Sequence, residues 1–145
     1  MIFKKNKMEK KTAMVVGCSN LGVSVASELS INQWNVVVLD INRNAFQKLP
    51  RYYGGETHIS NATNLERLEE AGIKDIGLFI VATDSDEVNI ASAQIAKVLY
   101  DVKNVVARIR DQEKSKLLED LGIKIICPPS LSIQEINEYI GGKDE

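Results

Sequence analysis

The chain has 145 residues, of which 44% are hydrophobic and 26% are charged, and its net charge is −2. This balance is typical of a soluble globular protein and argues against nucleic acid as a partner. No apolar run approaches the roughly 20 residues that cross a bilayer. We therefore expect a flexible basic leader over residues 1–11, which lacks the apolar segment of a secretory signal, and one domain over residues 12–145.

The first predicted strand, Thr12–Gly17, leads through a tight turn into a predicted helix, Asn20–Asn32. Gly17 permits a sharp exit from the strand, and Gly22 lets the helix pack closely on the sheet. A helix that begins at such a turn directs its free N–H groups and positive dipole end toward a phosphate. Ser19 stands where the G-x-G-x-x-G motif has its middle glycine, and its hydroxyl could bond a phosphate oxygen.

The second predicted strand, Asn35–Leu39, ends at Asp40. Asp40 follows Gly22 at close to the ~20-residue spacing at which a carboxylate accepts both ribose hydroxyls of a nucleotide. Arg43 lies where an arginine can accept a ribose 2′-phosphate, but Asp40 would repel that group. The spacing therefore predicts a nucleotide whose ribose carries no 2′-phosphate.

Strands and helices alternate along the rest of the chain, and strands such as Leu78–Ala82 are apolar throughout, as in a parallel strand buried on both faces. This pattern predicts an α/β, doubly wound, Rossmann-like parallel sheet of six strands in the order 3-2-1-4-5-6, with a ligand between strands one and four. The remaining predicted strands are 57–60, 77–82, 104–109 and 124–127. The remaining predicted helices are 44–49, 64–71, 85–100, 112–121 and 131–140.

Polar residues follow the third, fourth and fifth predicted strands. Asn61-Ala62-Thr63 leaves room for a flat base, although these residues also suit a helix cap. The carboxylates within residues 84–87 suggest either a metal or acid–base site or a capping box between Asp84 and Glu87, and we favour the capping box. Arg108 and Arg110 alternate onto one side at the carboxyl edge, where phosphates would lie, although solvation is the default for such side chains.

Two further features concern reactivity and packing. Cys18 lies at a helix N-terminus, where a thiolate is stabilised, but we favour a small residue filling a tight turn. The last predicted helix carries Ile133, Ile136 and Ile140 on one face. We expect this face to pack on the helix's own sheet, with a partner protein as the alternative.

Taken together, six motifs resemble the nucleotide-binding RCK domain, the regulator of potassium conductance, also known as the TrkA N-terminal domain. The resemblance covers about Thr12 to Ile140. The motifs are Val16–Gly22, Val38–Asn42, Ser60–Thr63, Val81–Asn89, Val106–Asp111 and Gly122–Pro128.

The resemblance implies a cytoplasmic regulatory subunit, peripheral to the membrane, that binds NAD(H) or an adenine nucleotide (AMP, ADP or ATP). It also implies a homodimer or larger homo-oligomer that passes its ligand state to the membrane subunit of a potassium transporter. By motif, the phosphate would lie against the turn, the ribose against Asp40, the adenine beside Ala62 and Thr63, and the distal group near Thr83 and Arg108. The full set implied is Gly17, Cys18, Ser19, Asn20, Leu21, Gly22, Asp40, Ile41, Asn61, Ala62, Thr63, Ala82, Thr83 and Arg108.

The alternative is a fragment of an NAD-dependent oxidoreductase. A dehydrogenase normally needs a substrate domain and a proton donor, whereas the predicted nucleotide fold fills this chain. The single histidine, His58, lies inside a predicted strand. We therefore expect a sensor without catalytic or metal-binding residues.

Overall fold

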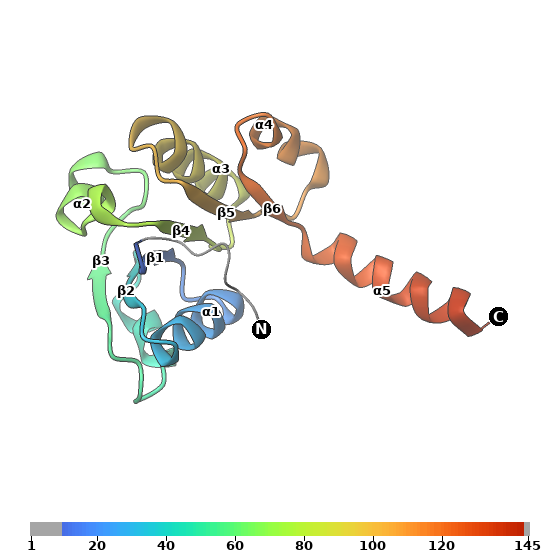
Figure 1. The fold of residues 1–145 in the computed structure, drawn as a ribbon, viewed down its shortest axis with the longest axis horizontal. Helices are drawn as coiled ribbons and strands as arrows, with labels where there is room; N and C mark the ends of the chain where they lie inside the picture. Colours follow the sequence, from blue (N-terminus) through green and yellow to red (C-terminus); the bar gives the residue numbers. More distant parts are fainter. Residues whose placement is uncertain (1–9, 144–145) are drawn as a thin grey trace.

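The computed structural model describes residues 10–143; residues 1–9, most of the predicted leader, and residues 144–145 lie outside the described range. Six parallel strands form one sheet in the order β3-β2-β1-β4-β5-β6 (Figure 1), which confirms the predicted architecture. The strands are β1 (Thr12–Val16), β2 (Asn35–Asp40), β3 (Glu56–Ile59), β4 (Leu78–Val81), β5 (Asn104–Arg108) and β6 (Lys124–Ile126).

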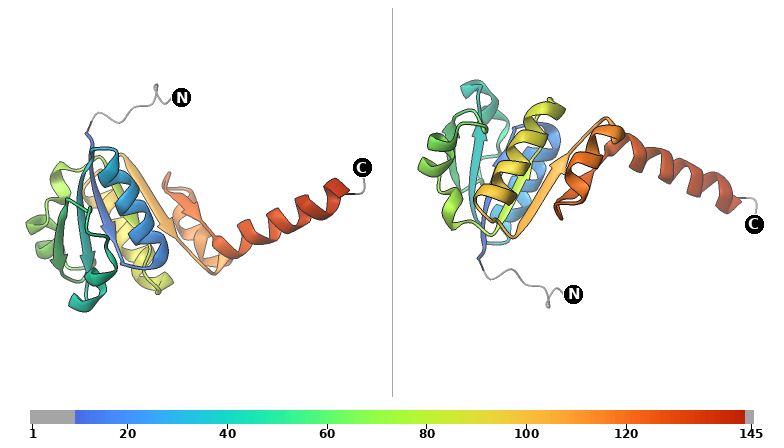
Figure 2. Two further views of the ribbon diagram at one scale, coloured as in Figure 1. Left: turned by 90° about the horizontal axis from the view of Figure 1, so that it is seen from below. Right: turned by 90° about the horizontal axis from the view of Figure 1, so that it is seen from above.

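Helices cover both faces of the sheet (Figure 2). One face packs against α1 (Asn20–Ile31) and the 3-10 helix η2 (Arg43–Lys48). The other face packs against α2 (Leu65–Glu70), α3 (Asp86–Gln94) and α4 (Lys116–Glu119). The connecting 3-10 helices are η3 (Ile73–Asp75) and η5 (Gln112–Ser115), and the π-helix η4 (Ile95–Leu99) extends α3.

The apolar strands explain the two-sided core. All four residues of β4 are buried, and neighbouring residues enter opposite layers because side chains alternate across a strand. Phe79 packs in the layer under α2 and α3, whereas Ile80 packs in the layer under α1. The two packed layers therefore fix the positions of the strands. The loops that follow the strands start from these fixed positions.

Three of the predicted helices are less regular than their sequence suggested. The predicted helix 44–49 forms as the 3-10 helix η2. The predicted helix 85–100 ends as an α-helix at Gln94 and continues as the π-helix η4. The predicted helix 112–121 divides into η5 and α4, because Asp111 accepts a hydrogen bond from the Glu113 N–H and starts a tighter turn. Periodicity indicates where a chain coils, but it does not separate these related helix types.

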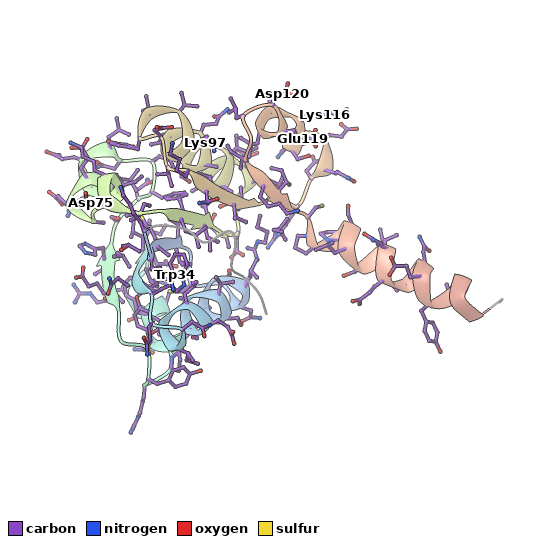
Figure 3. The ribbon with its side chains drawn as sticks, in the orientation of Figure 1. Trp34, Asp75, Lys97, Lys116, Glu119 and Asp120 are labelled. Carbon is purple, nitrogen blue, oxygen red and sulfur yellow. The ribbon has the colours of Figure 1, made fainter. Side chains whose placement is uncertain are left out.

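The expected packing of the last helix is wrong. The helix α5 (Pro128–Lys143) starts at two prolines, which suit the first helical turn, and extends away from the sheet (Figures 1 and 2). Its isoleucines Ile133, Ile136 and Ile140 are 59%, 58% and 55% exposed. Figure 3 shows the side chains of α5 reaching into open space along the helix. Whether the apolar face of α5 packs on the sheet depends on the direction that the chain takes after β6. The amphipathic pattern does not encode that direction.

Candidate functional site

A crevice with a volume of about 460 Å³ opens at the carboxyl ends of β1 to β4. It lies where the chain reverses the direction in which it builds the sheet, from β1 outward to β3 and then back across to β4. Ligands of open α/β sheets bind at such a switch point. Residues of the crevice wall include Val16, Gly17, Cys18, Ser19, Asp40, Ile41, Asn42, Ala45, Lys48, Ser60, Asn61, Ala62, Thr83, Asp84, Ser85 and Val88.

Two glycines allow the turn between β1 and α1 to pack against backbone. Gly17 has a φ of +101°, and a side chain there would meet the main chain of Ala82 at 2.9 Å. A Cβ on Gly22 would overlap the carbonyl oxygen of Gly17. The helix can therefore start this close to the strand only with glycine at both positions.

Ser19 fixes the start of α1. Its hydroxyl accepts a hydrogen bond from the Gly22 N–H at 3.1 Å and donates one to the Ala82 carbonyl at 2.7 Å. The hydroxyl proton is therefore engaged with β4 rather than with the crevice. The N–H groups of Asn20 and Leu21 have no carbonyl partner within their helix, because they lie in its first turn.

The carboxylate of Asp40 is held by main-chain donors. Its Oδ2 accepts from the Cys18 N–H at 2.8 Å, and its Oδ1 accepts from the Asn42 N–H at 2.8 Å. Each oxygen keeps a further lone pair for another donor, such as a hydroxyl. The acid at the end of β2 is thus placed beside the glycine turn before any ligand arrives.

Cys18 is not set up for redox chemistry. Burial, together with the nearby Asp40 charge, raises the pKa of its thiol to about 11, and Lys48 opposes this rise only in part. The thiol is therefore protonated at neutral pH, and a thiol is a poor nucleophile. The structure favours the packing role for Cys18.

Eight residues of the crevice wall lie outside the predicted site set, and Lys48 and Ser60 are two of them. The Nζ of Lys48, at the end of η2, donates to the Cys18 carbonyl at 3.3 Å. The Oγ of Ser60, just after β3, is buried and has no hydrogen-bond partner. No spacing rule identifies Lys48, whereas the position of Ser60, next to the predicted Asn61, was an available signal.

At the ends of β4 and β5, the side chain of Asn89 makes hydrogen bonds to main-chain groups that would otherwise need water as their partner. Its Oδ1 accepts from the Thr83 N–H and hydroxyl at 3.1 and 2.6 Å. Its Nδ2 donates to the carbonyls of Thr83 and Arg108 at 3.1 and 2.7 Å. Asn89 is 1% exposed, so this amide joins the ends of β4 and β5 from inside the protein.

The prediction that Asp84 caps the helix α3 is wrong. Ser85 caps α3 by accepting from the Val88 N–H, and Asp84 instead contacts Arg108 at 3.4 Å and Arg110 at 3.2 Å. The Arg108 side chain is only 12% exposed, against 57% for Arg110, so solvation describes Arg110 alone.

The next acid, Asp86, accepts from the N–H groups of Arg110 and Asp111. Burial raises its pKa, but these two bonds, with Lys114 and Arg110 nearby, outweigh burial and leave the pKa below its usual value. The acids at the start of α3 thus hold the loop after β5.

The structure brings eight of the predicted site residues to the crevice wall, namely Gly17, Cys18, Ser19, Asp40, Ile41, Asn61, Ala62 and Thr83. The other six, Asn20, Leu21, Gly22, Thr63, Ala82 and Arg108, are not part of the wall. Several of them support it: Thr63 donates to Asn61, and the Ala82 carbonyl accepts from Ser19. Over residues 10–143, no cluster of three metal-ligating side chains occurs and no helix is long and apolar enough to span a membrane.

This sheet order and this crevice define a doubly wound, Rossmann-like parallel α/β domain. The TrkA-N domain model matches residues 13–129, and the chain therefore belongs to the TrkA-N family.

Three known proteins illustrate the relationship. The Trk system potassium uptake protein TrkA of Streptomyces coelicolor is 30% identical over 114 residues, which are 79% of this chain and 51% of that protein. The chain thus spans about half the length of that relative. The TrkA-N domain of the inner membrane protein ybaL from Escherichia coli superposes with a TM-score of 0.79 at 17% identity, covering 90% of this chain and 96% of that one. The GsuK channel bound to NAD gives 0.76 at 20% identity, covering 94% and 24%. At these identities the structural matches establish the fold.

Proposed function

We propose that this domain binds an adenine nucleotide or NAD(H) in the crevice and acts as a nucleotide sensor. The observation that carries the proposal is the Asp40 carboxylate, which two main-chain N–H groups hold at the crevice wall beside the start of α1. In this arrangement Asp40 accepts hydrogen bonds from the ribose hydroxyls, and the first turn of α1 faces the phosphate. The base lies over Ala62, whose small side chain leaves room for a flat ring.

Proteins of the same fold support this choice of ligand. GsuK has been solved with NAD and with ADP, and a Kef C-terminal domain from Shewanella denitrificans has been solved with AMP. All three ligands share an adenosine joined to a 5′-phosphate. We therefore propose that the adenosine phosphate is the part of the ligand that this crevice recognises.

We further propose that the domain regulates potassium uptake from the cytoplasm, at the membrane through a partner subunit. Support comes from its relatives, which are Trk system potassium uptake proteins. The mechanism is differential binding: two nucleotides that favour different geometries of the assembly shift its equilibrium by the difference of their binding free energies. That shift would bias the pore of the membrane subunit.

The assembly we propose is a homodimer or a larger ring of this chain. Support comes from α5, where a run of exposed apolar residues extends clear of the sheet. These residues are Leu131, Ile133, Ile136, Tyr139 and Ile140. Exposed apolar surface of this kind marks an interaction site more often than it marks free surface.

We favour the sensor over an oxidoreductase, because neither Cys18 nor His58 is placed to act as a general base in the crevice at neutral pH. The Cys18 thiol is protonated at neutral pH. His58 stands on β3, 3.5 Å from Glu56, and is not among the residues of the wall.

Isothermal titration calorimetry of the purified chain with NAD, NADH, AMP, ADP and ATP tests the proposal. We expect saturable binding of at least one of them, and at least tenfold weaker binding by the Asp40→Ala variant. Asp120→Ala is the matched control, because Figure 3 shows Asp120 on the outer side of α4, away from the sheet. Absence of binding by all five compounds would end the proposal, and unchanged affinity in Asp40→Ala would remove the ribose role.

The regulatory role needs a separate measurement. We expect potassium uptake by cells that carry the transporter to depend on this chain, and Asp40→Ala to abolish the dependence of uptake on nucleotide. Multi-angle light scattering should give a mass of at least two chains, and the double variant Ile133→Glu with Ile136→Glu should lower it. A monomer at all concentrations would contradict the assembly.

A further inference from the structure

We propose that Lys48 binds the 5′-phosphate of the nucleotide and makes affinity depend on that phosphate. The inference rests on the proposed nucleotide-binding function and adds a ligand contact that the glycine motif does not contain. Among the described residues that line the crevice, Lys48 is the one lysine or arginine. Its position comes from the fold, since 30 residues separate it from the carbonyl that it contacts.

The geometry places the ammonium group at the turn. The 3-10 helix η2 ends at Lys48, and Nζ lies 3.3 Å from the Cys18 carbonyl oxygen. That distance is long for a bond from an ammonium to a carbonyl, so the group can move to a stronger acceptor at little loss. A phosphate at the first turn of α1 is such an acceptor, because it carries charge and the carbonyl does not.

Charge balance explains why a cation is needed there. The wall carries the carboxylates of Asp40 and Asp84, and a phosphate monoester adds further negative charge. Asp84 is already paired with Arg108 and Arg110. Lys48 therefore remains the cation of the wall that can offset the phosphate, and the two N–H groups at the start of α1 share that task.

The same geometry selects the 5′-phosphate over a 2′-phosphate. A 2′-phosphate would lie against Asp40, where the carboxylate repels it. The Cys18 carbonyl, in contrast, belongs to the turn that faces the 5′-phosphate in the proposed binding mode. Lys48 should thus distinguish 5′-AMP from both 2′-AMP and adenosine.

The test compares the affinities of 5′-AMP, 2′-AMP and adenosine in the unchanged chain and in Lys48→Gln and Lys48→Arg. We expect Lys48→Gln to weaken 5′-AMP roughly 5- to 10-fold while leaving adenosine within about twofold, and Lys48→Arg to restore most of the loss. The loss should shrink when ionic strength rises from about 0.05 M to about 0.5 M. Arg43→Gln is the matched control, because Arg43 begins the same 3-10 helix but is not part of the wall.

Four results would overturn the inference. Equal losses for adenosine and 5′-AMP would mean that Lys48 only supports the turn. A greater loss for 2′-AMP would place the ammonium at the ribose instead. Unchanged 5′-AMP affinity in Lys48→Gln would remove the contact while leaving the proposed function intact, whereas no binding by the unchanged chain would overturn both.

A second observation carries an independent inference: we infer that the Ser60 hydroxyl hydrogen-bonds to the adenosine part of the ligand. Its oxygen is buried at the crevice wall without a hydrogen-bond partner. Most buried polar atoms in proteins have such a partner. The Ser60 N–H donates to the Asp40 carbonyl at 3.1 Å, so Ser60 stands beside the proposed ribose site and away from the turn.

Replacing Ser60 should therefore affect adenosine and 5′-AMP alike. We expect Ser60→Ala to weaken both by roughly 3- to 10-fold, without a lower melting temperature, since the hydroxyl has no partner to lose within the protein. Ser130→Ala is the control, because the Ser130 hydroxyl donates to Gln112 near β6. Unchanged adenosine affinity in Ser60→Ala, or a loss confined to 5′-AMP, would overturn the inference.

Discussion

The two halves of the crevice hold their carboxylates in different ways. Asp40, the last residue of β2, accepts hydrogen bonds from two main-chain N–H groups at 2.8 Å each. Asp84, after β4, has a side chain that is 86% exposed and contacts two guanidinium groups instead. Main-chain donors are fixed by the sheet and the turn, whereas the exposed Arg110 side chain keeps much of its rotamer freedom.

The difference teaches which half is preorganised. The half of the crevice at the end of β2, the Asp40 half, presents the Asp40 carboxylate as a rigid hydrogen-bond acceptor. This suits recognition of the ribose that every adenine nucleotide contains. The Asp84 half has a rigid backbone, clamped by the buried amide of Asn89, with a movable ion pair on its surface. A part of the ligand that varies from one nucleotide to another would meet that adjustable surface.

The largest effect should follow from filling the space between β1 and α1. Gly22→Ala forces a methyl group into the Gly17 carbonyl, so we expect a loss of about 3 kcal/mol or more in the free energy of unfolding. Gly141→Ala is the control, since Gly141 lies in α5 with nothing within 4 Å, and it should leave stability equal or slightly higher. Denaturant titration measures both, and comparable stability of the two variants would refute the tight approach.

The clamp under the Asp84 half comes next. Asn89→Ala leaves the Thr83 N–H and the Arg108 carbonyl without partners inside the protein, and we expect a loss of about 2–3 kcal/mol. Asn64→Ala, which removes the exposed cap of α2, should cost only about 1 kcal/mol. Urea titrations measure both losses in the free energy of unfolding. Equal losses for the two variants would contradict a special role for Asn89 in joining the ends of β4 and β5.

The two carboxylates can be compared directly by the same chemical change. Asp40→Asn turns one acceptor into a donor that faces a main-chain N–H, so we expect a loss of about 1–2 kcal/mol. Asp84→Asn weakens exposed ion pairs and should change stability by less than about 0.5 kcal/mol. Thermal melts of the pair test the contrast, and a larger effect at Asp84 would reverse our view of which half is rigid.

The smallest effect at neutral pH concerns Cys18, and it appears only in alkali. Because the folded-state pKa of about 11 exceeds the ordinary value of 9.0, the contribution of this thiol to stability is complete below pH 9 and is lost as the pH rises toward 11. The slope from one such group is at most about 1.4 kcal/mol per pH unit. Cys18→Ala should flatten the decline measured between pH 9 and pH 11.

Alkylation gives an independent reading of the same thiol. At pH 8 iodoacetamide should label Cys127, which is partly exposed, well before the buried Cys18, as followed by mass spectrometry. Rapid labelling of Cys18 at that pH would contradict its burial and its raised pKa.

Much of the site could be predicted because its rules are local. Glycine at positions 17 and 22 follows from sterics that any strand–turn–helix of this shape must obey, and Asp40 follows from the length of one crossover. Asp84 could not be assigned in this way. Its spacing to Glu87 fits a cap, but Ser85 competes for the same role, and Arg108 and Arg110 at and after the end of β5 offer Asp84 other partners.

The sequence by itself determined the parallel six-stranded sheet, its strand order and the glycine turn, because buried apolar strands and crossover handedness leave few other arrangements. Only the tertiary structure decided that α5 leaves the sheet, that Lys48 reaches the turn and that Ser60 is buried without a partner. These features depend on distances between residues far apart in the chain. Such distances exist only after the sheet has brought those residues together, so no local pattern of residues records them.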